Sequence, residues 1–204
     1  MIRFFLAGAC ACLLALGGCA SAPLTAVIHH YTLGGPTTMT GHAAAAGHEV
    51  LQIARIHVPT WLADTGMDYR LDYRHANRLA VYGYSDWAAA PAQLLEALLQ
   101  QTLARADDWR AVIGPDNPAH ANVSLHLRLN DFSQHFATPD HSTGVVDATA
   151  TLIDAADGHV IAQKHFHIDA AAPSADAQGG AEALGEASRQ LAGQLERWLG
   201  LRKR

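Results

Sequence analysis

The sequence predicts a two-layer α+β fold in which two helices cover one face of a mostly antiparallel sheet. The first observation behind this prediction is a segment from Val123 to Phe132 in which apolar and polar residues alternate. Such alternation is typical of a strand with one buried face. The second observation is a pair of segments whose apolar residues recur three and four positions apart, as on one side of a helix. The two layers would bury these apolar surfaces against each other.

Further strands are predicted on both sides of this segment. Short extended segments are expected at residues 28–33, 49–58, 69–74 and 79–84. The alternation of the long strand returns in Val146, Ala148, Ala150 and Leu152. Residues 154–158 have turn composition, and the strand after them carries Val160, Ala162, Phe166 and Ile168. This order predicts an antiparallel hairpin.

The two predicted helices have apolar faces of similar character. The first starts near Pro91, a residue suited to the first turn of a helix. Its apolar face consists of Leu94, Leu95, Leu98, Leu99 and Leu103. The second helix is C-terminal, and its apolar face consists of Leu184, Ala187, Leu191, Leu195, Trp198 and Leu199.

The start of the chain has the composition of a secretory signal peptide. Arg3 precedes an apolar run from Phe4 to Leu16, which is shorter than the roughly 20 residues that a membrane-spanning helix needs. The letters Leu16-Gly17-Gly18-Cys19 resemble the lipobox of bacterial lipoproteins, in which a peptidase cuts before a cysteine whose thiol has been diacylated. The alternative is an ordinary cleavable signal followed by an incidental cysteine.

Cysteine usage favours lipidation of Cys19. Cleavage would remove Cys10 and Cys12 and leave Cys19 alone, so the mature chain could form no internal disulfide. Fatty acyl chains such as palmitate add roughly 0.8 kcal/mol per buried methylene, which makes two or three chains an effectively permanent anchor. In bacterial lipoproteins an Asp after the cysteine favours the inner membrane. Ala20 stands there instead, which implies the periplasmic face of the outer membrane.

The predicted organisation has four parts. Residues 1–18 are the signal peptide, 19–28 a lipidated tether, 29–200 a single domain, and 201–204 a solvated tail. Residues 37–47, rich in Gly, Ala and Thr, are expected to form a mobile loop. The twelve steps from Cys19 to Tyr31 span at most roughly 40 Å, so the domain would work close to its own membrane.

Charge argues against nucleic acid as a partner. Without Arg3, 13 basic residues stand against 19 acidic ones, which gives a net charge of −6 with His neutral. Phosphate binding needs a basic stripe, and none is visible in the sequence.

Landmarks after the tether resemble the ABC-type transport auxiliary lipoprotein family in order and spacing. They are Tyr31-Thr32-Leu33-Gly34, residues 51–59 with Trp61-Leu62, Tyr69-Arg70, Arg74, Asn77-Arg78-Leu79, Tyr82, Trp87-Ala88 and Pro91. The resemblance is close from Tyr31 to about Ala106 and looser afterwards. Two departures are Asp86, where the family usually has Arg, and a Pro that usually lies one residue nearer to the Trp. Six landmark residues are expected to be structural or partner-facing: Tyr31, Leu33, Pro59, Arg70, Trp87 and Pro91.

The resemblance implies a non-enzymatic component of a lipid transport system, and no cofactor or metal site is predicted. Its partners would be an ABC permease and ATPase and a mammalian-cell-entry (MCE) domain protein, which carry lipid between the inner and outer membranes. A ring-like or other homo-oligomer would suit docking beneath a tubular MCE assembly. Two rival functions stay open: an envelope assembly lipoprotein that helps insert lipopolysaccharide or outer-membrane proteins, and a periplasmic hydrolase.

Three groups of residues suggest more specific sites: a metal site, an aromatic patch and a catalytic triad. His165 and His167 share a strand face, with His126 on a neighbouring strand, but solvated histidines are expected there and no further metal motif is present. The aromatic residues Tyr69, Tyr73, Tyr82, Tyr84 and Trp87 could form a lipid- or partner-facing patch, although core anchors are the more common role. Asp140-His141-Ser142 joins three catalytic residue types, but adjacency in sequence is not triad geometry.

Overall fold

The computed structural model describes residues 27–34, 47–106 and 108–201. In these ranges eight strands form one mixed sheet, accompanied by three α-helices and a short 3-10 helix, η2. The strands are β1 (His29–Tyr31), β2 (Val50–Ile53), β3 (Gly66–Leu71), β4 (Leu79–Trp87), β5 (Ala111–Ile113), β6 (Val123–Thr138), β7 (His141–Asp154) and β8 (Val160–Ala171). The helices are η2 (Thr60–Leu62), α2 (Asp72–His75), α3 (Pro91–Arg105) and α4 (Ala177–Gly200).

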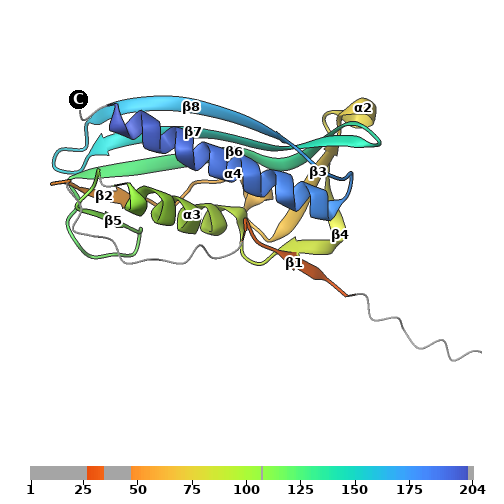
Figure 1. Ribbon diagram of the computed structural model, residues 1–204, viewed down its shortest axis with the longest axis horizontal. Coiled ribbons are helices and arrows are strands. Elements are labelled where there is room, and N and C mark those ends of the chain that lie inside the picture. Colours follow the sequence, from red (N-terminus) through yellow and green to blue (C-terminus); the bar gives the residue numbers. More distant parts are fainter. Residues whose placement is uncertain (1–26, 35–46, 107, 202–204) are drawn as a thin grey trace, which may run out of the picture.

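Strand β6 organises the sheet. One edge of β6 pairs along its whole length with β7, which in turn pairs with β8. The other edge is shared, because β2 pairs with the first part of β6 and β3 with the last part. Strand β5 lies beside β2, while β4 and then β1 lie beside β3. The sheet therefore has a β2–β5 end and a β1–β3–β4 end, which lie far apart along the molecule (Figure 1).

The α+β class is confirmed, but the prediction of a mostly antiparallel sheet is wrong. Four of the seven strand pairings are parallel, namely β1–β4, β2–β5, β2–β6 and β3–β6. The predicted antiparallel hairpin is present, as β7 and β8. The short N-terminal strands join by long crossover connections, which parallel neighbours require. Parallel neighbours are not joined by a tight turn, so no local feature of the sequence indicates that these strands are parallel.

Helices α3 and α4 pack on the same face of the sheet and bury its apolar residues (Figure 1). Every apolar residue predicted for the second helix is buried, while in the first Leu94 and Leu98 are only partly buried. Asp176 caps α4 by accepting a hydrogen bond of 2.8 Å from the Gly179 amide. Several boundaries differ from the prediction; the strand expected at 49–58, for example, ends at Ile53. The expected strand at 69–74 ends at Leu71 and continues as α2, and β5 was not predicted.

Gly144 on β7 lets α4 approach the sheet closely. A Cβ at this position would lie 2.5 Å from the Leu184 backbone nitrogen. We therefore expect Gly144→Ala to lower the free energy of unfolding by about 2 kcal/mol, as overpacking does. Gly83 on β4 is the matched control, because a Cβ there meets no described heavy atom within 4 Å. Urea unfolding followed by circular dichroism would test this, and equal stability of the two variants would contradict it.

Candidate functional site

Four of the six landmark residues lie in or beside the helix-covered core. Tyr31 pairs in register with Trp87, whose ring packs edge-to-face on Phe132 with the centroids 5.4 Å apart. Leu33 is buried, and its carbonyl accepts a hydrogen bond of 3.0 Å from Arg189. Pro91 is the first residue of α3. These positions lie against the core, and we propose a structural role for the four landmarks.

Tyrosines divide between core and surface. Tyr69 and Tyr82 are partly buried, with their rings tilted by 40° and the centroids 4.6 Å apart, and the Tyr82 hydroxyl donates to the Gln134 side chain. Tyr73 and Tyr84 are exposed. The five aromatic residues are therefore neither all core anchors nor one exposed patch.

The other two landmarks, Pro59 and Arg70, lie on the face of the sheet that α3 and α4 leave open. Pro59 precedes η2 and lines an open groove of about 590 Å³. The groove is formed by His57, Val58, Pro59, Trp61, Arg128 and Asn130. The Arg70 guanidinium lies over the Trp61 ring, with Cζ 5.9 Å from the ring centroid. Trp61 thus connects the groove to Arg70.

A row of charged side chains crosses this open face from β3 to β8, and we call it the carboxylate row. Its members are Arg70, His135, Asp131, Asp147, His165 and His167. At its centre Asp131 on β6 and Asp147 on β7 are direct cross-strand neighbours. Two like charges placed opposite each other destabilise a sheet unless each is compensated. The surrounding residues provide that compensation.

Asp131 is compensated from β3 and from its own strand. Its Oδ2 lies 3.4 Å from Arg70 Nη2 and 3.3 Å from His135 Nε2, and Ser133 donates to its Oδ1. Burial alone would raise the pKa of Asp131, but the hydrogen bonds from His135 and Ser133 outweigh burial and lower it. The other ring nitrogen of His135 lies 3.1 Å from Asp72 Oδ2. Burial would lower the pKa of His135, but the hydrogen bond to Asp131 and both carboxylates raise it.

Asp147 is compensated from β6 and β8. Asn130 donates to its Oδ1 at 2.9 Å, and ring nitrogens of His165 and His167 each lie 2.9 Å from its carboxylate. Burial would raise the pKa of Asp147, but these three hydrogen bonds lower it. The shared strand face predicted for His165 and His167 is thus present, and both rings meet one carboxylate. The sequence did not identify Asp147 as the group that joins them, although its alternation with Val146 and Ala148 marked it as polar-facing.

Asp68 lies beside the row and is the least solvated acid near it, with 5% of its surface exposed. It stands two residues before Arg70 on β3. Burial is the largest cause that raises the pKa of Asp68, Asp64 and Asp131 add to it, and Arg70 opposes them; together they bring this pKa to about 7. The group therefore changes charge near neutral pH, next to the carboxylate row.

Comparison with known protein families shows which family the chain matches. The family model for the ABC-type transport auxiliary lipoprotein component matches residues 31–196. The chain belongs to this family. The sequence resemblance is therefore confirmed, and the match extends well beyond Ala106 to include β6, β7, β8 and most of α4.

Solved structures share the fold of this family member at low sequence identity. A Xanthomonas campestris protein is 17% identical with a TM-score of 0.68, and the alignment covers 85% of this chain and 91% of that one. An uncharacterized protein is 16% identical with a TM-score of 0.65, and the coverage is 85% and 99%. These likenesses support the α+β fold alone. No curated protein matches the sequence significantly.

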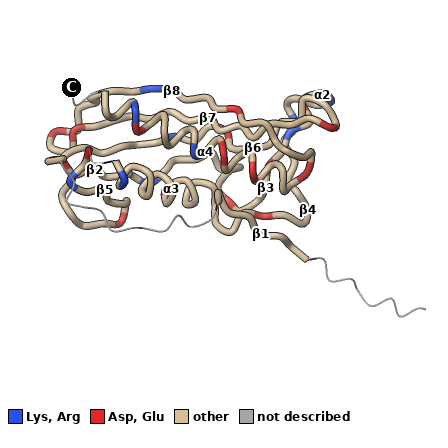
Figure 2. Tube along the Cα trace, in the orientation of Figure 1, with Lys and Arg blue, Asp and Glu red and all other residues tan. Residues whose placement is uncertain are grey.

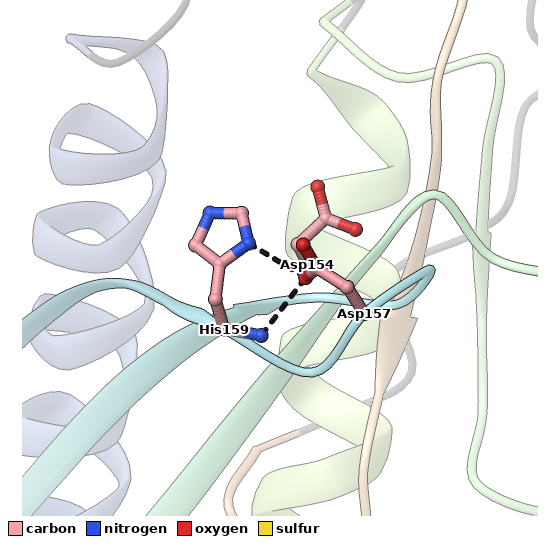
Figure 3. A group of neighbouring side chains, drawn as sticks. All are labelled: Asp154, Asp157 and His159. Atoms are coloured by element: carbon pink, nitrogen blue, oxygen red, sulfur yellow. Dashed lines mark hydrogen bonds and ion pairs between the residues drawn. The ribbon is translucent and has the colours of Figure 1, made fainter.

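Potential metal ligands gather in the β7–β8 turn of the auxiliary lipoprotein, away from the row. Ligand atoms of Asp154, Asp157 and His159 lie within 4.8 Å of one another. Figure 3 shows Asp157 accepting hydrogen bonds from both the amide and the ring of His159. Asp154 likewise accepts from the Ala156 amide. These contacts are those of a turn held by its own side chains, and they account for the cluster without an ion.

The rival catalytic residues of the hydrolase hypothesis do not converge. Asp140 lies in the β6–β7 turn, and His141 contacts Thr138 across that turn. The Ser142 hydroxyl accepts a hydrogen bond of 2.8 Å from Gln134. The family is one of transport components rather than enzymes.

The lipidation residue Cys19, the signal peptide and most of the predicted loop at 37–47 lie outside the described residues. Within the described ranges, no helix combines the length and the apolar character needed to cross a membrane.

Proposed function

We propose that the protein is acylated at Cys19, held at the periplasmic face of the outer membrane, and serves an ABC transport system as a non-enzymatic component. The cargo would be lipid carried between the inner and outer membranes, and the partners an MCE-domain protein and the permease–ATPase complex. The family match over residues 31–196 is the observation that carries this proposal. Residues 1–18 would be removed as the signal peptide, and residues 19–28 would tether the domain at 29–200.

The open face of the sheet is the surface we assign to the partner protein. The carboxylate row and the groove beside Trp61 offer charged groups, hydrogen-bonding groups and one partly exposed aromatic ring within a single face. Arg and Trp are the residue types that contribute most to protein interfaces. A charged, solvated surface of this kind suits a polar protein surface better than an acyl chain, so the domain would dock the transporter rather than carry lipid itself.

Affinity purification of the full-length acylated protein from crosslinked, detergent-solubilised envelopes tests this function. We expect the permease, the ATPase or the MCE protein among the captured proteins. The test variant is Arg128→Glu, which reverses the charge of an exposed side chain on the open face and is expected to abolish capture while the protein stays in the membrane. Capture of barrel-assembly or lipopolysaccharide-insertion proteins would contradict the proposal and favour the assembly lipoprotein.

A further inference from the structure

The β1–β4 corner of the sheet exposes four apolar side chains. Val27 and Ile28 precede β1 and are 70% and 49% exposed, while Val81 and Tyr84 on β4 are 56% and 63% exposed. The parallel register that places His29 beside Ser85 brings Ile28 next to Tyr84. We refer to these four residues as the apolar corner. Single exposed apolar residues are common, but four on two adjoining segments need an explanation.

The apolar corner contrasts with the rest of the surface in charge. Residues 27–34 and 79–85 contain no Asp, Glu, Lys or Arg. Figure 2 shows β1 without charged residues, whereas α2, α4 and the β7–β8 turn carry them. Two carboxylates border the corner, because Asp64 lies beside Val81 near Gly66, and Asp86 pairs in register with Gly66. An uncharged surface with Tyr, Val and Ile is the composition that enters the interfacial layer of a bilayer.

The apolar corner is also the point at which the domain continues toward its acylation site. Only eight steps separate Cys19 from Val27, and they can span at most about 29 Å. The opposite end of the sheet, formed by β2, β5 and the β7–β8 turn, lies at the far side of the molecule (Figure 1). Acylation would therefore hold the apolar corner, and not the far end, nearest to the lipid.

We propose that the apolar corner seats the domain on the bilayer that holds Cys19, with Tyr84 and Ile28 entering the headgroup region. The proposal rests on the acylation of Cys19 in the proposed function. It adds that the domain has a fixed orientation rather than swinging freely on its tether. The sheet would then stand with its β2–β5 end away from the membrane and its open face accessible from the side.

Fluorescent probes on single cysteines test this orientation. In the acylated protein the Cys19 thiol is blocked, so Tyr84→Cys or Ile28→Cys introduces the sole free thiol for an environment-sensitive dye. Val160→Cys is the matched control, because Val160 is 59% exposed and begins β8 at the far end. The proteins are reconstituted in vesicles of phosphatidylethanolamine and phosphatidylglycerol, some of them brominated. We expect a blue shift at positions 84 and 28, and several-fold stronger bromine quenching there than at position 160.

Three results would overturn the seating. The first is vesicle flotation of the protein with equally weak quenching at positions 84, 28 and 160, which would leave the lipid anchor intact and refute only the fixed orientation. The second is a blue-shifted probe at position 84 in the non-acylated Cys19→Ser protein, measured without detergent or vesicles, which would show that another protein surface covers the corner. The third is a protein with unmodified Cys19 that does not float, which would refute the anchor as well.

Discussion

The lipobox peptidase cuts only before a diacylated cysteine, so Cys19→Ser is tested behind a signal peptide that is cleaved without acylation. This variant is expected to move the protein from the membrane fraction to the soluble periplasmic fraction. The expected change is close to complete, because the acyl chains would supply the anchoring energy. Without the thiol no thioether lipid can form, and residues 19–28 would no longer link the domain to the membrane. Cell fractionation with mass spectrometry of the N-terminal peptide measures both the location and the modification.

Cys10 and Cys12 provide the controls for this experiment. Both lie inside the apolar run that the proposed cleavage removes, so Cys10→Ser and Cys12→Ser should leave the mature protein and its location unchanged. Release caused by either of these variants, or a Cys19→Ser protein that stays in the membrane, would place the acylation site elsewhere.

Asp68→Asn is expected to stabilise the domain at pH 8 by about 4 kcal/mol, because the pKa of Asp68 is about 7 in the folded domain against an ordinary 3.8, and a tenfold change in proton affinity corresponds to about 1.36 kcal/mol. In the unfolded chain Asp68 ionises near its ordinary pKa of 3.8, whereas in the folded domain its pKa is about 7. Between these values the folded state binds more protons than the unfolded state. The wild type therefore loses stability as pH rises from about 4 to 7, and this loss is complete above 7.

Comparison of unfolding free energies at pH 4, 6 and 8 measures this effect. The Asp68→Asn variant should match the wild type at pH 4 and exceed it increasingly toward pH 8. Asp147→Asn is the contrasting control, because the pKa of Asp147 is lowered and its ionised form stabilises the fold. That variant should be less stable than the wild type at pH 8. A wild type whose advantage over Asp68→Asn grows with pH would contradict the assignment.

Local periodicity was sufficient to predict the central part of this fold. Alternation predicted the β7–β8 hairpin and the first part of β6, and three- and four-residue spacing predicted both long helices. Strand β6 runs six residues beyond the predicted end at Phe132. The reason is the irregularity between Leu129 and Asp131, which shifts the alternation by one residue and hides the continuation.

The candidate site was harder to predict, because it depends on pairings between distant strands. His165, His167 and Arg70 were recognised individually, whereas Asp131 and Asp147 were not. Their importance follows from a cross-strand register that brings residues sixteen positions apart face to face. The parallel pairing of β3 with β6, which brings Arg70 and His135 together, has no local signal either.

Site-specific photocrosslinking in the intact envelope is the most direct test of transporter docking on the open face. A photoreactive residue would replace the exposed Arg128 on the open face in one acylated protein, and the exposed Gln190 on α4 in the control. We predict that position 128 captures the permease, the ATPase or the MCE protein and that position 190 does not. Capture of these partners at position 190 alone, or of outer-membrane assembly proteins at position 128, would contradict a transporter docked on the open face.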